Sequence, residues 1–174
     1  MGLKDVLAEL RGLDAAGVVE RYAIGGAVAA LRYVSVASTD DVDVFLTFTA
    51  KSRERLDPLA PIYDYLVGRG ARVEGEHLVI AGWPVHFLPS DEPLLQEAMS
   101  EARDVDVDGA ATRVFTAEHL AAIALQLGRP KDKLRVVQMV EEKVLDMARF
   151  ESILKRHNLA SKWDRFSKTI LGEQ

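Results

Sequence analysis

The sequence contains no cysteine among its 174 residues. This absence excludes disulfide bonds, thiolate metal sites and thiol nucleophiles, and it fits a protein of a reducing compartment. Long apolar runs are also missing, since no stretch approaches the roughly 20 apolar residues that a membrane-spanning helix needs. The N-terminal segment MGLKDVLAELRGLD is amphipathic and charged, unlike a signal peptide. We therefore expect a soluble, cytoplasmic protein with no membrane partner.

Composition and charge limit further which kind of protein this chain can be. Hydrophobic residues make up 48% of the chain, and its length suggests one domain or one domain with a small appended lobe. The net charge of −5 argues against a uniformly basic nucleic-acid-binding surface. Residues 129–174 nevertheless carry 11 Lys and Arg against 7 Asp and Glu. This uneven charge permits binding of a phosphorylated molecule at the junction, and helices with surface ion pairs explain it equally well.

Hydrophobic periodicity predicts a βα alternation that feeds a small mixed sheet. We expect helices over residues 2–12, 27–34, 57–67 and 91–102, and strands at RYAI before a double glycine, at residues 42–48, and as a pair or trio within residues 72–88. DVDVDGAATRVF alternates around a glycine as a hairpin does. Three or four helices follow from Thr116. The predicted fold class is α/β, with a core over residues 1–115 and a C-terminal helical region over residues 116–174 packed on it.

Two carboxylates interrupt the strand in TDDVDVFL. Asp41 and Asp43 are two positions apart, so on a strand they project to one face, about 6.6 Å apart at Cα. Burying two like charges so close together is costly unless a cation lies between them. Hard oxygen ligands of this kind suit Mg²⁺ or Mn²⁺. The alternative is a pair of capping or solvent-facing acids at a strand edge.

A double glycine precedes the carboxylate pair. Gly25 and Gly26 follow a strand and open a helix, where the backbone can approach a ligand closely and free N–H groups can face an anion. A phosphate held there would reach a metal on Asp41 and Asp43. Glycine pairs alone are usually only tight turns, so the combination with the acidic pair carries the prediction.

With both motifs in view, the chain resembles the nucleotidyltransferase superfamily, which has a polymerase-β-like fold. YAIGGAVAALRYVSVASTDDVDVFL is similar to the superfamily signature, in which a Gly-Gly or Gly-Ser pair opens a helix and an acid-x-acid pair follows on the next strand. TAEHLAAIALQLGRPKDKLRV resembles the branch of abortive-infection nucleotidyltransferase toxins and their uncharacterised relatives, where an R-x-K-D sequence follows a helix. The resemblance covers roughly residues 20 to 140.

The resemblance implies transfer of a nucleoside monophosphate from a nucleoside triphosphate to an acceptor hydroxyl, on RNA, protein or a small molecule. It makes Asp41 and Asp43 the Mg²⁺ or Mn²⁺ ligands. The triphosphate would be bound by a set of six residues: Gly25, Gly26, Thr39, Arg129, Lys131 and Asp132. Within this set Lys131 would contact phosphate or support the site, with Asp132 orienting it. A plain helix start after Pro130 is the alternative for these last two residues.

One position departs from the superfamily pattern. A third carboxylate is usual on a later strand, and here the corresponding position in WPVHFLP is His86. Imidazole can ligate a metal or accept a proton, but it is a poor ligand for Mg²⁺. Asp91 and Glu92 lie just beyond as possible substitutes. Because Pro84 suggests an edge strand or a bulge, alternation leaves open whether His86 reaches the site or is structural.

Two functions therefore compete. The first is an active nucleotidyltransferase with Asp41, Asp43 and His86 as catalytic residues. The second is a catalytically impaired module of the same fold, of regulatory or toxin–antitoxin type, which binds a partner through its basic tail. The other three histidines (His77, His119 and His157) are expected at the surface or behind the site. Trp83 and Trp163 are expected in the core.

Overall fold

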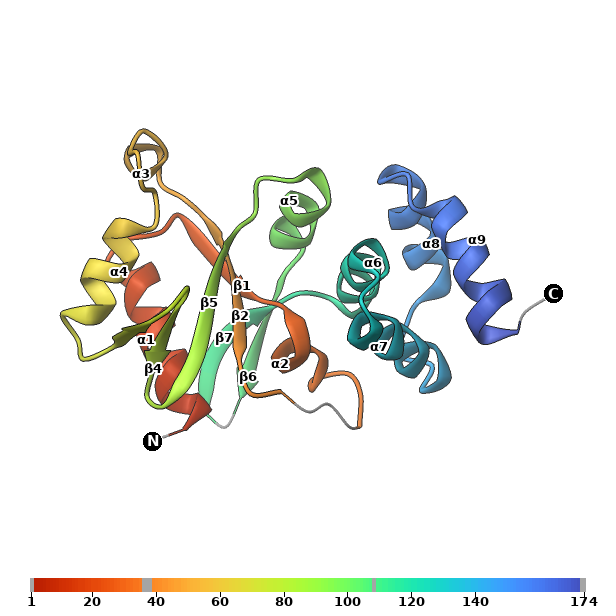
Figure 1. Ribbon diagram of the computed structural model, residues 1–174, viewed down its shortest axis with the longest axis horizontal. Helices are drawn as coiled ribbons and strands as arrows, with labels where there is room; N and C mark the ends of the chain where they lie inside the picture. Colours follow the sequence, from red (N-terminus) through yellow and green to blue (C-terminus); the bar gives the residue numbers. More distant parts are fainter. Residues whose placement is uncertain (1, 36–38, 108, 173–174) are drawn as a thin grey trace.

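The computed structural model describes residues 2–35, 39–107 and 109–172. Within these residues the chain forms one mixed sheet of seven strands in the order β3-β4-β5-β2-β1-β7-β6, with helices on both sides (Figure 1). The strands are β1 (Arg21–Ile24), β2 (Val42–Thr47), β3 (Arg72–Glu74), β4 (His77–Ile80), β5 (Trp83–Pro89), β6 (Arg103–Val107) and β7 (Ala110–Val114). The predicted α/β class is confirmed.

The centre of the sheet sets the geometry of the site. β2 runs antiparallel to β1 and parallel to β5, and β1 runs parallel to β7. On β2 the side chains of Val42 and Val44 are completely buried, as alternation predicts for one face of a strand. Asp43 and Phe45 therefore face the opposite side of the sheet.

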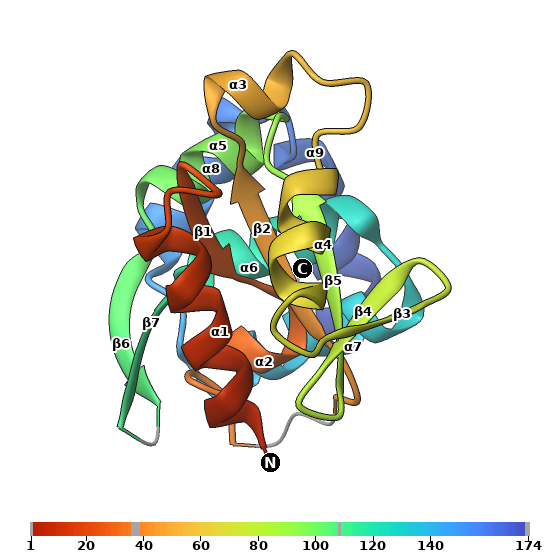
Figure 2. The same ribbon diagram turned by 90° about the vertical axis from the view of Figure 1, so that its left-hand side faces the viewer.

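Helices α1 (Leu3–Ala15) and α4 (Ala60–Val67) cover one face of the sheet (Figure 2). The buried stripe of α1 has the helical spacing that its sequence predicts, with Val6, Leu7 and Leu10 all at zero exposure. The remaining helices of this part of the chain are α2 (Gly26–Ala30), α3 (Ala50–Arg53) and α5 (Pro93–Ser100). The hydrophobic core lies on both faces of the sheet and extends from α1 to the C-terminal helices.

Four helices follow the sheet: α6 (Ala117–Leu127), α7 (Pro130–Glu141), α8 (Met147–Arg156) and α9 (Ala160–Phe166), with a short π-helical segment after them at Ser167–Leu171. They lie on the side of the sheet away from α1 (Figure 1). The Thr116 side chain caps α6 by accepting a hydrogen bond from the His119 backbone N–H. Trp163 is buried, with its ring centroid 5.1 Å from that of Phe150, as expected of a core residue. The division of the chain at residue 115 stays a prediction.

Three predicted helices are shorter than the sequence indicates, and one of them is α5, which spans Pro93–Ser100 within the expected residues 91–102. α2 ends at Ala30, because the next residues form tight turns in which Arg32 N–H bonds to Ala29 O and Tyr33 N–H bonds to Ala30 O. α4 begins at Ala60, and Asp57 instead closes a turn before it by accepting a bond from Leu59 N–H. None of these differences changes which residues line the candidate site.

No helix in the described part of the chain is long and apolar enough to cross a bilayer. The cytoplasmic location stays a prediction.

Candidate active site

Gly25 and Gly26 allow the backbone to lie in close contact with β2, the strand that carries Asp43. The Gly25 N–H donates a hydrogen bond to the Asp43 carbonyl at 3.0 Å. Gly26 has a φ of +58°, and a Cβ there would lie 2.1 Å from Asp43 Oδ2. A Cβ at Gly25 would lie 2.4 Å from the Phe45 ring. The φ of Gly26 and its approach to Asp43 both favour glycine there, and a side chain at Gly25 would displace the Phe45 ring, because the turn lies directly against the side chains of β2.

Asp41 and Asp43 lie together beside this turn. Asp41 immediately precedes β2 and Asp43 is its second residue. Thr39 fixes the first of them, since its hydroxyl lies 2.8 Å from the Asp41 carbonyl oxygen and 3.0 Å from Asp41 Oδ1. Burial raises the pKa of Asp43, and the neighbouring Asp41 charge raises it further. The pair thus has the electrostatic stress that a bound cation would relieve.

His86 lies within the site. In the parallel pairing of β2 and β5, His86 is the direct partner of Asp43. Its Nε2 is 3.7 Å from Asp41 Oδ2, and its positive form would lower the pKa of Asp43. The expectation that Pro84 marks an edge or a bulge is wrong, because β5 lies between β4 and β2. Pairing with β2 begins only at Val85, so β2 does not require an N–H from Pro84.

The start of α7 supplies cations opposite the carboxylates. Arg129 is the N-cap residue of α7 and Pro130 its first residue. Asp132 is completely buried and accepts hydrogen bonds from Arg129 Nε at 2.6 Å, Arg129 Nη2 at 3.2 Å and the Arg129 backbone N–H at 3.3 Å. Asp132 therefore orients Arg129, and the predicted role of orienting Lys131 is not what its contacts show.

Lys131 and Arg135 are one helical turn apart on α7, so they share a face. Both charges act to lower the pKa of Asp43. Among the described residues Lys131 forms no ion pair, whereas Arg135 lies 3.9 Å from Asp132 Oδ1. Arg135 borders the candidate site although it is not among the residues predicted from the sequence. The signal was available, since positions 131, 135 and 138 have the spacing of one helix face.

Two cavities, of about 420 and 560 Å³, meet at the site and share five residues: Asp41, Asp43, Arg129, Lys131 and Arg135. The smaller one extends along α7 and has a mostly polar lining that includes Thr39 and Gln138. The larger one extends toward α5 and α6, past His86 and Glu92, and is lined there by apolar side chains: Leu88, Leu95, Phe115, Leu120, Ile123 and Leu127. Asp91 is absent from both linings, so only Glu92 of the two expected substitutes borders the site.

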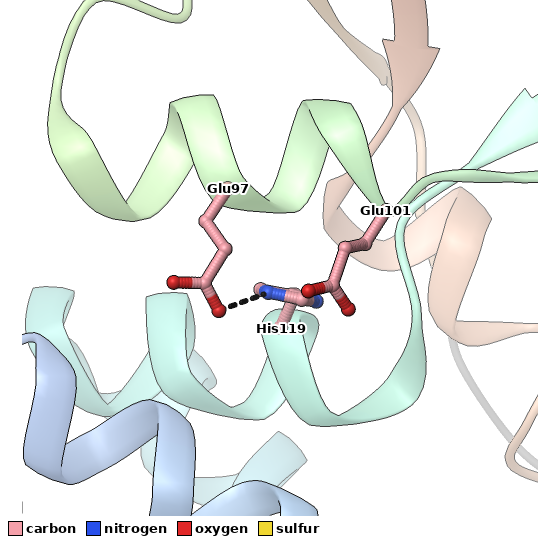
Figure 3. Close-up of side chains that lie close together, drawn as sticks. All are labelled: Glu97, Glu101 and His119. Carbon is pink, nitrogen blue, oxygen red and sulfur yellow. Dashed lines mark hydrogen bonds and ion pairs between the residues drawn. The ribbon is translucent and has the colours of Figure 1, made fainter.

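A second polar cluster lies between α5 and α6, where the ligand atoms of Glu97, Glu101 and His119 are within 4.8 Å of one another (Figure 3). Its carboxylates are already paired. Glu97 binds Arg156 at 2.6 Å, lies 2.6 Å from His157 Nε2 and 3.2 Å from His119 Nε2, while Glu101 binds Arg149. The hydrogen bond from Arg156 and those from the histidines lower the pKa of Glu97 to about 2.

His119 corrects the expectation of a surface or near-site residue. It is completely buried, and burial lowers its pKa. Its Nδ1 lies 2.7 Å from Thr116 Oγ1, so a neutral ring with its proton on Nε2 satisfies both Thr116 and Glu97. The cluster thus joins α5, α6 and α8 as a structural network, and its arginines occupy the oxygens that a metal would need. His77 lies behind the candidate site, with its ring 5.3 Å from that of His86.

This chain is similar to known proteins in structure and not in sequence. No family model matches the sequence, and no curated protein matches it. Solved structures do match. An antigenic nucleotidyltransferase-like protein from Paracoccidioides brasiliensis superposes with a TM-score of 0.59 at 16% identity, covering 92% of this chain and 91% of that one. The fold is nucleotidyltransferase-like.

Two structures of ANT(2'')-Ia agree with this assignment. One, in complex with adenylyl-2''-tobramycin, has a TM-score of 0.57 at 15% identity and covers 94% of this chain and 98% of its own. The other, a solution structure of this antibiotic-resistance factor, has a TM-score of 0.53 at 16% identity with 98% coverage of both chains. At such identities the nucleotidyltransferase-like fold is what the likeness establishes. The resemblance to the abortive-infection branch stays a prediction.

Proposed function

We propose that this protein binds a nucleoside triphosphate with a divalent cation and transfers a nucleotidyl group to an acceptor hydroxyl. One observation carries the proposal: Asp41 and Asp43 are held against a glycine turn and face Arg129, Lys131 and Arg135 across a shared cavity. A fold alone does not define an activity. The arrangement of charges around the cavity is what supports nucleotidyl transfer here.

The donor set fits a divalent cation. Asp41 and Asp43 would hold it, because their side chains converge and Asp43 bears the cost of burial beside a like charge. A bound cation would neutralise charge that develops on the transferred phosphoryl group. Asp43 Oδ2 occupies the space that a side chain at position 26 would need, so the glycine leaves this oxygen in place as a ligand. The residues present are thus suited to the metal that the fold implies.

The polar cavity along α7 suits the triphosphate. Arg129 is held by buried Asp132 at a fixed orientation, and a pre-oriented guanidinium binds phosphate oxygens with two parallel hydrogen bonds. Lys131 adds an unpaired charge among the described residues, and Thr39 lines the same cavity. These groups would bind the phosphates and offset the charge of the departing pyrophosphate.

In the transfer, the acceptor oxygen forms a bond to the α-phosphorus while the bond from that phosphorus to the β-phosphate oxygen breaks. Pyrophosphate leaves with the electron pair, and the hydroxyl proton passes to water. Water reaches the site because the side chains of His86 and Asp41 are 36% and 42% exposed. The role of the protein is to align the two reactants and to supply fixed charges.

The acceptor would enter through the larger cavity, whose outer lining is apolar. ANT(2'')-Ia was solved with adenylyl-2''-tobramycin, which is an antibiotic that carries an adenylyl group. Here the leucine lining and Glu92 favour a hydroxyl on a protein or small molecule over a polyanionic RNA strand. A cytoplasmic setting would supply both reactants.

The proposal is tested by mixing the protein with each labelled triphosphate and Mg²⁺ or Mn²⁺. Wild type should bind at least one nucleotide, and Asp41→Asn with Asp43→Asn should abolish that binding. Asp64→Asn, an exposed carboxylate on α4, is the matched control and should bind as wild type. Equal nucleotide binding by the double variant and wild type would reject the site.

A second function is favoured by His86 at the position of a third carboxylate: a catalytically impaired regulatory or toxin–antitoxin-type module that binds a partner. In that case co-purification of the partner would survive loss of both aspartates. Transfer activity that appears only in His86→Asp would mark a decayed active site. Transfer activity already present in wild type would exclude this second function.

A further inference from the structure

A row of side chains crosses the sheet at the site. Pairing of β4 with β5 sets Leu78 opposite Val85, so the next positions, His77 and His86, lie side by side. His86 in turn is paired with Asp43 on β2. The row continues to β1, where the Gly25 N–H bonds to the Asp43 carbonyl. An imidazole is therefore built into the sheet beside the carboxylates at a fixed register position.

The distance between His86 and Asp41 suits two ligands of one ion. Nε2 and Oδ2 are 3.7 Å apart. Metal–ligand bonds to histidine nitrogen and carboxylate oxygen are each about 2.1 Å, so two ligands of one ion lie at most about 4.2 Å apart. A cation placed between these two atoms would also lie beside Asp43, the strand partner of His86.

The type of donor atom then selects the metal. Mg²⁺ binds oxygen ligands almost exclusively, whereas first-row transition ions accept imidazole nitrogen readily. Mn²⁺ combines tolerance of a nitrogen ligand with the affinity for carboxylate and phosphate oxygen that this cleft requires. A site of two carboxylates and one imidazole thus binds Mn²⁺ better than a site of three carboxylates would, relative to Mg²⁺.

We propose that His86 is the third ligand of the cation at Asp41 and Asp43, and that this site selects Mn²⁺ over Mg²⁺. The proposal rests on the proposed function, since it concerns the same cation, and it names the class of metal. His86 then stands at the position where the resemblance leads us to expect a third carboxylate, and it binds the metal rather than taking the hydroxyl proton.

Metal binding without turnover tests this inference. Purified protein free of nucleotide is titrated with Mn²⁺, and the free ion is followed by electron paramagnetic resonance, with Mg²⁺ as competitor. Wild type should prefer Mn²⁺. In His86→Asp the ratio of Mn²⁺ to Mg²⁺ affinity should fall about tenfold or more, comparable with the loss on removing a group that supports a metal. An unchanged ratio overturns the proposal.

Pulsed resonance on the bound ion provides a direct readout. Wild type should show coupling of Mn²⁺ to a nitrogen-14 nucleus, and His86→Asp should lose it. His77→Gln is the matched control, because it removes the neighbouring ring 5.3 Å away and should retain the coupling. Coupling that survives His86→Asp and disappears in His77→Gln overturns the assignment.

The two proposals fail in different ways. If wild-type Mn²⁺ binding is unaffected by Asp41→Asn with Asp43→Asn, the proposed function loses its metal site. If the double variant loses metal and nucleotide while His86→Asp keeps the wild-type ratio and nitrogen coupling, the proposed function stands and the role of His86 is refuted. Circular dichroism of each variant confirms that the fold is retained.

Discussion

Gly26 and Asp43 are in such close approach that a Cβ on the first would lie 2.1 Å from a carboxylate oxygen of the second. Contacts that short do not occur, so any other residue at position 26 must displace the aspartate. The position of a charged group on β2 is therefore set by an absent side chain at the start of α2. The position of one of the two acids in the candidate site therefore depends on this glycine.

Replacing Gly26 by alanine should abolish metal and nucleotide binding. Two effects act on this variant, namely the strained φ of +58° and the clash with Asp43. Gly17→Ala separates them, because Gly17 has a φ of +66° and nothing within 4 Å of the added Cβ. We expect each variant to lose about 1 kcal/mol of stability through backbone strain. Only Gly26→Ala should lose Mn²⁺ and nucleotide in calorimetric titrations; equal binding by both variants would show that the close approach does not matter.

Removing Asp132 should weaken both folding and nucleotide binding. Asp132→Ala removes the carboxylate that accepts the Arg129 backbone N–H at the start of α7, and it lets the Arg129 side chain rotate freely. We expect the free energy of unfolding in urea to fall by about 2 kcal/mol and the nucleotide affinity to fall several-fold. Asp146→Ala is the control, because Asp146 caps α8 by accepting a bond from Arg149 N–H at 3.1 Å and lies outside both cavities. It should lower stability by about 1 kcal/mol and leave nucleotide affinity unchanged. The opposite pattern would contradict the role given to Asp132.

The metal-free protein should become more stable when Asp43 loses its charge. Because burial and Asp41 raise the pKa of Asp43, the charged carboxylate costs stability at neutral pH, above the unfolded-state pKa. Asp43→Asn should therefore raise the free energy of unfolding by roughly 0.5–2 kcal/mol, the range found when strained sites are relieved. Asp64→Asn should have no such effect. Added Mn²⁺ should stabilise wild type and not Asp43→Asn; destabilisation of the metal-free protein by Asp43→Asn would show that the charge pair is already compensated.

Acid should weaken the junction of α5, α6 and α8 through Glu97. The folded-state pKa of Glu97 is about 2, below its ordinary value of 4.5, chiefly because of Arg156. Its contribution is complete above pH 4.5 and is lost as pH falls toward 2. Because the Glu97 side chain is 19% exposed, we expect it to contribute about 1–2 kcal/mol to the free energy of unfolding, which is less than the full pKa shift implies. The midpoint temperature of thermal unfolding should be lower for Glu97→Gln than for wild type at pH 7, and the two should converge near pH 2. Glu151→Gln should have the midpoint of wild type at every pH.

The elements of the site that the sequence could predict are the ones encoded locally. Gly25 and Gly26 were recognisable because a strand ends and a helix begins at adjacent residues, and Asp41 and Asp43 because alternation places them on one face. Both signals lie within a short stretch of chain. The fold class followed from the same local periodicities.

The missed features depend on pairing between distant segments. Whether His86 reaches Asp43 is decided by the parallel register of β2 and β5, which no pattern within WPVHFLP specifies. The sequence predicts His119 at the surface or behind the site, because its position gives no sign of its partner Glu97 on α5. The role of Asp132 was assigned to the wrong cation, since sequence proximity to Lys131 does not reveal which side chain bends back toward it.

Helix α7 has side-chain hydrogen bonds at both ends, and those at its C-terminal end reach another part of the chain. Its first turn is joined to Arg129 by Asp132, and at its far end Glu142 accepts hydrogen bonds from the N–H and the hydroxyl of Ser35, both at 2.8 Å. Ser35 follows α2, whose first residue belongs to the glycine turn. The Glu142 side chain therefore links α7, which carries Lys131 and Arg135, to the segment that follows α2, so one carboxylate connects the cationic side of the cavity with the glycine side.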